Sequence, residues 1–346
     1  MSLAVVVHAP RDLRVEDVPD PSLEADEVEV RIGVGGICGS DLHYYQDGGF
    51  GTVRIKEPLV LGHEIAGTVA AVGAQVTAVR PGDKVAVNPS RPCGQCRYCR
   101  EGLALHCLDM RFFGSAMRFP HVQGGFRQRL VAHERQCVRV PDDLPLEKAA
   151  FAEPLAVCLH AVSRAGPLLG RRVLITGAGP IGMLTLLAAR HAGAAEIVIT
   201  DIAAPPLALA ERLGADETIN VAKDPAAMAR LQAGKGSFDV MFEASGHEAA
   251  LRQGLEGVRP RGVIVLIGLG NGDTRLNLNL AVAKEVEVRG TFRFDAEFAW
   301  AVEAIASGRI DPSPLLTDVM PMRDALHAFE HAADRSRAMK VQLAFD

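Results

Sequence analysis

One thiol, one imidazole and one carboxylate occur at positions from which they could hold a single metal ion. Cys38 lies in a glycine-rich stretch without a CxxC partner, and His63 and Glu64 follow an apolar run about twenty-five residues later. A structural zinc site usually has four Cys and His ligands, so a mixed donor set from distant segments predicts an open, catalytic site. Glu153 is a further candidate, because a carboxylate in an apolar run is costly to bury without a partner such as a metal or a metal-bound water.

A second group of candidate ligands is local. Four cysteines in the segment 90–108 have the spacing C-x2-C-x2-C-x7-C: Cys93, Cys96, Cys99 and Cys107. Four thiolates this close can surround one tetrahedral ion, which predicts a structural zinc. An iron–sulfur cluster is the alternative, but the ferredoxin pattern continues with x3 and Cys-Pro. His106 is interpreted as a surface residue, because the thiolates already satisfy the metal.

A third motif predicts a dinucleotide site. Residues 172–176 read as a buried strand, followed by a GxGxxG motif, a helix over 183–191 and a strand over 196–200 that ends at Asp201. Such glycines let the backbone approach a pyrophosphate at the helix N-terminus, and the acid binds the ribose hydroxyls. No Arg or Lys occurs in residues 202–206, which favours NAD over NADP. The candidate contacts are Gly177, Gly179, Pro180, Ile181, Gly182, Asp201, Ser245, Gly268, Leu269, Phe292 and Arg293.

These sites need two kinds of scaffold. Up to about residue 144 short apolar–polar alternations are broken by Gly and Pro, which indicates a β-barrel or sandwich. After residues 141–145 strands at 238–243 and 262–268 alternate with helices at 208–213 and 248–258, which predicts a doubly wound parallel sheet. A helix at 296–307 and a strand at 340–343 are expected to return to the first domain.

Length and composition fit this picture. A chain of 346 residues is long enough for two domains. A net charge of −5, with 48% hydrophobic and 23% charged residues, lacks the basic excess of nucleic-acid-binding proteins and favours a small-molecule ligand. Neither a signal peptide nor eighteen uninterrupted apolar residues is found, so a cytoplasmic protein that contacts no membrane is expected.

The signatures together resemble the zinc-dependent medium-chain alcohol dehydrogenases of the polyol type. Residues 36–41, 62–64, 153–155, 177–182 and the four-cysteine segment carry this resemblance, which runs nearly from end to end. It implies an α/β fold with a GroES-like β-barrel catalytic domain over 1–149 and 291–346. It also implies a Rossmann NAD-binding domain over 150–290 and a homotetramer or homodimer.

The resemblance also implies a reaction and its machinery. Cys38 and His63 would bind the catalytic zinc with either Glu64 or Glu153, so each chain would hold NAD and two zinc ions. Zinc would polarise a secondary alcohol whose hydride passes to the nicotinamide. Ser40 would take the proton and pass it through the nicotinamide ribose to His43, although simple loop hydrogen bonding is the alternative for both. Residues 36–44 are expected to form one loop.

The resemblance further implies that the substrate is a sugar acid, L-idonate, oxidised reversibly to 5-ketogluconate. A guanidinium can bind both oxygens of its carboxylate, and the candidates are Arg111, Arg118 and Arg293, with Tyr44, Phe112 and His121 shaping the pocket. Sorbitol, xylitol and L-threonine are the alternative substrates. A non-catalytic protein that binds NAD and zinc is the alternative from another functional class.

Overall fold

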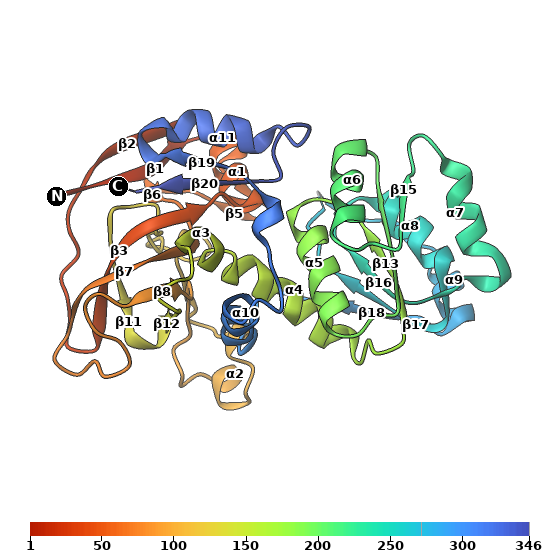
Figure 1. The fold of residues 1–346 in the computed structure, drawn as a ribbon, viewed down its shortest axis with the longest axis horizontal. Coiled ribbons are helices and arrows are strands. Elements are labelled where there is room, and N and C mark those ends of the chain that lie inside the picture. The colour runs from red at the N-terminus through yellow and green to blue at the C-terminus, as the bar shows by residue number, and fades with distance from the viewer. Residues whose placement is uncertain (271, 346) are drawn as a thin grey trace. The chain divides into compact units, whose positions relative to one another are not determined.

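The computed structural model describes residues 1–270 and 272–345 of the chain. It divides into two compact units, one comprising Met1–Glu153 and Phe298–Asp346 and the other Pro154–Glu297. The red amino-terminal and blue carboxy-terminal elements therefore belong to the same unit (Figure 1). The boundaries predicted from the sequence, after residues 149 and 290, lie four and seven residues earlier in the chain.

The main sheet of the first unit is a mostly antiparallel sheet of seven strands. Six follow the order β12-β8-β7-β3-β20-β19, and β11 pairs with β3. Their bounds are β3 (Glu27–Gly36), β7 (Glu64–Val72), β8 (Lys84–Val87), β11 (Arg129–His133), β12 (Cys137–Arg139), β19 (Leu316–Pro321) and β20 (Lys340–Ala344). Gly36, the last residue of β3, pairs with Glu64 on β7 and with Gln342 on β20. This register brings residues near positions 38, 64 and 340 to one end of the sheet.

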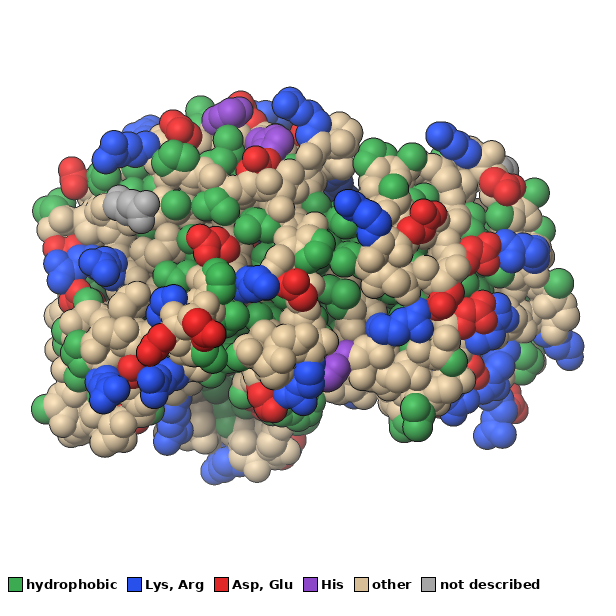
Figure 2. Space-filling model, in the orientation of Figure 1, with side chains coloured by type: hydrophobic (Ala, Val, Ile, Leu, Met, Phe, Trp, Pro, Cys, Tyr) green, Lys and Arg blue, Asp and Glu red, His purple; other side chains and the backbone are tan. Residues whose placement is uncertain are grey.

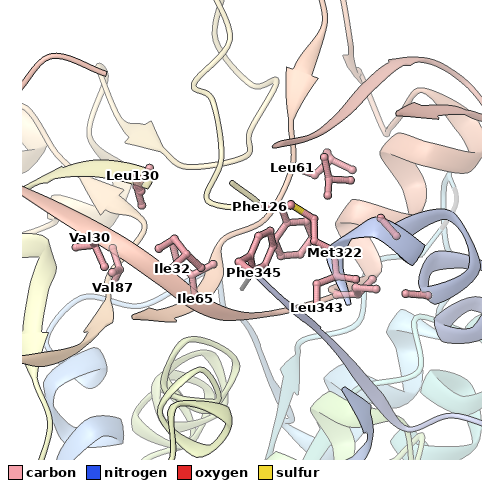
Figure 3. Close-up of a cluster of buried hydrophobic side chains, with 14 of the residues drawn as sticks. Val30, Ile32, Leu61, Ile65, Val87, Phe126, Leu130, Met322, Leu343 and Phe345 are labelled. Atoms are coloured by element: carbon pink, nitrogen blue, oxygen red, sulfur yellow. The ribbon is translucent and has the colours of Figure 1, made fainter. Parts of the chain in front are cut away.

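A smaller sheet and an apolar core complete this unit. The strands β2 (Asp12–Val18), β1 (Ser2–Ala9) and β6 (Leu59–Val60) form a three-stranded sheet. Figure 3 shows the core around Phe126 and Phe345, whose ring centroids lie 5.9 Å apart. Side chains from both ends of the chain fill it, including Ile65 and Leu343. The carboxy-terminal segment is thus part of the barrel core, as expected.

The second unit contains a parallel sheet of six strands in the order β15-β14-β13-β16-β17-β18. The strands are β13 (Arg172–Thr176), β14 (Glu196–Asp201), β15 (Glu217–Asn220), β16 (Phe238–Glu243), β17 (Val258–Leu266) and β18 (Glu287–Gly290). In chain order this is 3-2-1-4-5-6, the dinucleotide-binding arrangement, whose ligand crevice lies where the order reverses at the carboxyl ends of the strands. The predicted fold class is confirmed.

Besides α1 (Gly39–Asp47), which is described below, ten α-helices are found among the described residues. They are α2 (Arg97–Arg100), α3 (Leu146–Ala149), α4 (Ala152–Ala165), α5 (Pro180–His191), α6 (Ala204–Arg212), α7 (Pro225–Gln232), α8 (Glu248–Gly257), α9 (Leu278–Lys284), α10 (Glu297–Ala306) and α11 (Ala325–Ala333). Helix α5 begins three residues before the predicted start, because Pro180 occupies its first turn, where a missing N–H has no cost.

The expectation that residues 36–44 form one loop is wrong. Residues Gly39–Asp47 form helix α1, and Cys38 is its N-cap. Asp41 stabilises this start, because its Oδ2 accepts a hydrogen bond from the Cys38 N–H at 3.0 Å. The helix ends at Asp47, and its C-cap Gly48 has a φ of 70°, the left-handed conformation that glycine adopts readily. Cys38, Ser40 and His43 are therefore held by a capped helix.

The surface carries mixed charge. Figure 2 shows acidic and basic side chains on the visible face of both units. Among the described residues, no helix is both long and apolar enough to cross a membrane.

Candidate active site

The first unit brings one sulfur, one imidazole and one carboxylate together. Ligand atoms of Cys38, His63 and Glu64 all lie within 4.8 Å of one another. The pairing of β3 with β7 explains this proximity. Glu64 lies opposite Gly36, and Gly36 is two residues before Cys38 in the chain. The three donors that the sequence singles out are therefore close enough to bind one ion.

Glu64 has a buried partner that sequence reasoning missed. Lys340 Nζ donates to Glu64 Oε1 at 2.8 Å and to Oε2 at 2.6 Å, and the two side chains are only 4% and 2% exposed. Burial alone would lower the pKa of Lys340, but the Glu64 carboxylate raises it. The lysine thus neutralises Glu64 inside the protein. Only the pairing of β20 with β3 brings position 340 here, so no local sequence signal could have shown it.

His63 has a second carboxylate behind it. The fully buried Asp41 accepts hydrogen bonds from the N–H groups of Cys38 and Gly62, and its Oδ1 lies 3.7 Å from His63 Nδ1. His63 Nδ1 is buried and has no hydrogen-bond partner among the described residues. A carboxylate beside a ligating histidine is a common way to orient the ring toward a metal.

The electrostatics of the cluster favour a cation. Desolvation, with the nearby Glu64 carboxylate, raises the pKa of the Cys38 thiol to about 12. Burial raises the pKa of Glu153 to about 8, although the nearby His63 opposes that rise. Glu153 lies outside the three-residue group, but it interacts with each of its members. The cluster thus contains four acidic groups, namely the Cys38 thiol and the carboxyl groups of Asp41, Glu64 and Glu153. Of the described residues around them, only the Lys340 amine and the His63 imidazole can offset their charge, so a divalent cation would stabilise this environment.

The four-cysteine segment forms a separate group that could hold a metal ion. The sulfurs of Cys93, Cys96, Cys99 and Cys107 lie within 4.8 Å of one another, and those of Cys96 and Cys99 are 3.6 Å apart. All four are free thiols. Zinc–sulfur bonds of about 2.3 Å give a tetrahedral edge of about 3.8 Å, close to this separation. The Cys93 N–H also donates to the Cys107 sulfur at 3.1 Å, which stabilises a thiolate. Hereafter we term this segment the cysteine lobe.

The glycines of the second unit leave space where a pyrophosphate would bind. Helix α5 starts after Gly179, which offers no side-chain cap, so the first N–H groups of the helix are available to an anion. A Cβ added at Gly179 would meet no atom within 4 Å, which leaves its surroundings open. A Cβ at Gly182 would lie 1.8 Å from Gly177 O, so only glycine permits the close packing of α5 on the loop. The arrangement fits a dinucleotide.

Two carboxylates, at the ends of β14 and β16, accept hydrogen bonds from the glycine-rich turn or from loops beside it. Asp201 accepts hydrogen bonds from the N–H groups of Ala178 and Ala203 at 2.7 and 2.9 Å, so it lies against the glycine-rich loop. Glu243 was not identified from the sequence; it is buried at the end of β16 and accepts bonds from the backbone and hydroxyl of Ser245. Its position at a strand end directly before a Ser-Gly pair was the available signal.

The remaining candidates lie in varied settings. Ser40 and His43 are three residues apart on α1, which places them on one helix face, and His43 Nδ1 lies 3.3 Å from Asp47 Oδ2. In the second unit Leu269 is exposed and Arg293 stacks on Phe292 with its guanidinium 4.9 Å from the ring centroid.

Two aromatic candidates lie close to the cluster or its helix. The Phe112 ring centroid is 5.6 Å from that of His63. Tyr44 is buried on α1, and its hydroxyl accepts a bond from the Ala116 N–H at 3.0 Å. His121 offers a substrate no free nitrogen, because Nε2 accepts from the Lys56 N–H and Nδ1 donates to a carbonyl.

Arg111 and Arg118 line a pocket of about 390 Å³. Neither Cys38 nor His63 lines it, and Arg118 also pairs with Asp109. The structure therefore gives these two arginines a setting apart from the metal cluster. Arg293 belongs to the second unit.

Comparisons with known proteins agree with both halves of this description. Residues 24–142 match the alcohol dehydrogenase GroES-like domain, and residues 180–307 match the zinc-binding dehydrogenases. L-idonate 5-dehydrogenase (NAD(P)(+)) of Escherichia coli is 47% identical over 316 residues, which is 91% of each chain. The chain belongs to the zinc-dependent medium-chain alcohol dehydrogenase family.

One further relative and one solved structure extend the comparison. Human sorbitol dehydrogenase is 38% identical over 348 residues, covering all of this chain and 96% of its own. The crystal structure of the Escherichia coli L-idonate 5-dehydrogenase superposes with a TM-score of 0.95 at 44% identity, covering 99% of this chain and 98% of that one. The expectations of a GroES-like domain, a Rossmann-type sheet and dehydrogenase activity are thus confirmed.

Proposed function

We propose that the dehydrogenase oxidises a secondary alcohol of a sugar acid, with L-idonate as substrate and 5-ketogluconate as product. In this reaction the alcohol and NAD⁺ give the ketone, NADH and one proton. The observation that carries the proposal is the 47% identity to an L-idonate 5-dehydrogenase over 91% of both chains. A sorbitol-type polyol dehydrogenase is the second candidate, supported by 38% identity over the whole chain.

We assign the catalytic zinc to Cys38, His63 and Glu64, whose donor atoms lie within 4.8 Å of one another, with Glu153 as the alternative carboxylate. A zinc ion held there would lower the pKa of the substrate hydroxyl, and NAD would accept the hydride from the same carbon. Lys340 holds the Glu64 carboxylate in place through both oxygens, and Asp41 faces the His63 ring. The second zinc is assigned to the cysteine lobe.

Ser40 and His43 form the proposed proton path. The Ser40 hydroxyl would accept the proton of the substrate alcohol and release its own proton toward the nicotinamide ribose, from which the His43 ring, whose side chain is 43% exposed, would pass a proton to solvent. We expect Ser40→Ala to lower kcat by about 100-fold, because general acid–base groups contribute about 10²–10⁴. Unchanged turnover in this variant, with zinc and NAD bound, would eliminate the relay.

The cofactor is assigned as NAD. The backbone around Gly177, Gly179 and Gly182 would bind the pyrophosphate, with Asp201 at the ribose. Pro180, Ile181, Ser245, Gly268, Leu269 and Phe292 complete the proposed contacts. Residues 202–206 contain no Arg or Lys that would favour a 2′-phosphate, so we expect a much lower KM for NAD than for NADP.

The substrate carboxylate needs a cation. Of the three arginines predicted from the sequence, Arg293 is retained for this role, because Arg111 and Arg118 line a pocket that contains none of the proposed zinc ligands. Phe112 and Tyr44 would form part of the substrate wall. We further propose a cytoplasmic homotetramer or homodimer.

The proposed specificity is tested by initial rates of NADH formation on a panel of L-idonate, D-gluconate, sorbitol, xylitol and L-threonine, with purified enzyme loaded with zinc. We expect L-idonate to have the highest kcat/KM, since a site that binds a carboxylate disfavours uncharged polyols. Equal kcat/KM for sorbitol or xylitol would support the polyol dehydrogenase instead. NAD binding without turnover on any of these compounds would contradict both candidates.

A further inference from the structure

The pocket that contains Arg111 and Arg118 is lined by a third arginine, Arg127. It has a volume of about 390 Å³ and lies within the first unit. The rest of its lining comes from Pro21, Phe113, Pro120, His121, Val122, Gln123, Leu130 and Val131. Three cationic side chains thus meet in one pocket, and no carboxylate is among these lining residues of the described chain.

Arg127 is the most informative of the three. It is only 8% exposed, and its Nη2 donates to the Pro19 carbonyl at 2.8 Å. Its Nε is buried and has no hydrogen-bond partner within residues 1–270 and 272–345. Burial lowers the pKa of Arg127, and a neighbouring carboxylate, Asp20, opposes this only in part. A buried guanidinium with an unsatisfied donor is costly unless a further partner binds.

The other two arginines differ in their partners. Arg118 pairs with Asp109, whose side chain is largely exposed. Arg111 is exposed and forms no ion pair with any residue that the structure describes. Asp20 is itself paired with the amino terminus at 2.6 Å. The three arginines therefore have two acidic neighbours, Asp109 and Asp20, and Asp20 also pairs with the amino terminus.

We propose that this pocket is a second ligand site of the enzyme, which binds a compact oxyanion bearing phosphate or carboxylate groups. Arginine donates two parallel hydrogen bonds to either group, and three of them suit a ligand with more than one negative charge. A pocket of about 390 Å³ is within the range of small-molecule sites, about 300–1,000 Å³. The lining contains none of the proposed zinc ligands or dinucleotide contacts, so the proposed site shares none of those residues.

The test is calorimetric titration of the zinc-loaded enzyme with inorganic phosphate and, separately, with succinate. Ionic strength is held constant with sodium chloride, and saturating NADH occupies the glycine-rich loop, which could otherwise bind phosphate. The variants are Arg111→Gln and Arg127→Gln, with Arg80→Gln as the matched control. Arg80 is 79% exposed in the same unit and does not line the pocket.

We expect wild type and Arg80→Gln to bind one anion per chain with the same Kd. Arg111→Gln removes no ion pair among the described residues, and it should weaken binding about tenfold or more, because hydrogen bonds to a charged ligand are strong. A lower Kd for phosphate or for succinate would identify the preferred group. Equal Kd values for wild type, Arg80→Gln and Arg111→Gln would overturn the proposal, as would the absence of binding by wild type. Because Arg127→Gln could also unfold the enzyme, the outcome is decided by Arg111→Gln.

Discussion

The cluster of Cys38, His63 and Glu64 and the cysteine lobe are two groups within one unit that could each hold a metal ion, and they are assembled in opposite ways. The cluster takes its members and their partners from positions as distant as 38 and 340, and both Glu64 and Lys340 are buried. The lobe takes all four sulfurs from residues 93–107, and three of its four cysteines are half-buried. Pairing between distant strands assembles the cluster, whereas the local conformation of one short segment assembles the lobe.

This difference suggests a catalytic role for the cluster and a structural role for the lobe. Mixed sulfur, nitrogen and oxygen donors leave a position open for a substrate, whereas four thiolates close the shell of a zinc ion. The cluster also has buried carboxylates and an amine behind its donors, which the lobe lacks among the described residues. Changes to the cluster should therefore remove activity, and changes to the lobe should remove stability.

The largest expected effect comes from Cys38→Ser. Losing the thiolate should lower kcat/KM about 1,000-fold or more, because the metal that polarises the alcohol is no longer held. Zinc per chain should fall from two to one, as measured by inductively coupled plasma mass spectrometry. A variant that kept both zinc ions and near-normal kcat/KM would remove Cys38 from the reaction.

Lys340→Met tests the support behind the cluster. It leaves the Glu64 carboxylate buried without its partner, which should cost about 3–5 kcal/mol in the free energy of unfolding. Adding Glu64→Gln should recover part of that loss in a double-mutant cycle. Lys148→Met is the control, because its ion pair with Asp311 is largely exposed and should be worth at most about 1 kcal/mol. Equal losses in both lysine variants would show that Lys340 is no more than a surface partner.

Cys99→Ser tests the lobe. We expect it to lose one zinc per chain and to lower the thermal midpoint by about 5–10 °C, since 1 kcal/mol corresponds to about 2–4 °C in domains of this size. At temperatures well below that midpoint kcat should stay within about twofold of wild type. A loss of kcat as large as that of Cys38→Ser would show that the two metal groups are not independent.

Partial zinc removal should distinguish the two groups without mutation. Under a mild chelator, activity should disappear while one zinc per chain is retained, because four soft thiolates bind zinc more tightly than a mixed set with a carboxylate. Adding zinc should restore the rate of NADH formation. Simultaneous loss of both ions in proportion to activity would contradict the predicted order.

The sequence predicted the locally encoded features well. The four cysteines, the glycine-rich turn and the alternation of strands and helices in the second unit are patterns of neighbouring residues, and each forms the predicted kind of structure. Helix α1 was missed because glycines flank it, although Asp41 three residues after Cys38 is a capping signal.

Features that depend on strand register could not be predicted. The Lys340–Glu64 pair joins residues 276 positions apart, and only the pairing of β20 with β3 brings them together. The same holds for Arg111 and Arg118, which share a pocket with Arg127 rather than with the zinc ligands. A candidate arginine can be chosen by its chemistry, but only the fold decides which site it lines.

The most direct test of this account is an anomalous difference map from a crystal of the zinc-loaded enzyme, recorded at the zinc absorption edge. We predict two peaks per chain. One should be bonded to Cys38 and His63 with Glu64 or Glu153, and the other to the four lobe cysteines. A peak in the lobe alone, with none beside Cys38 and His63, would contradict the assignment of the cluster as the catalytic metal site.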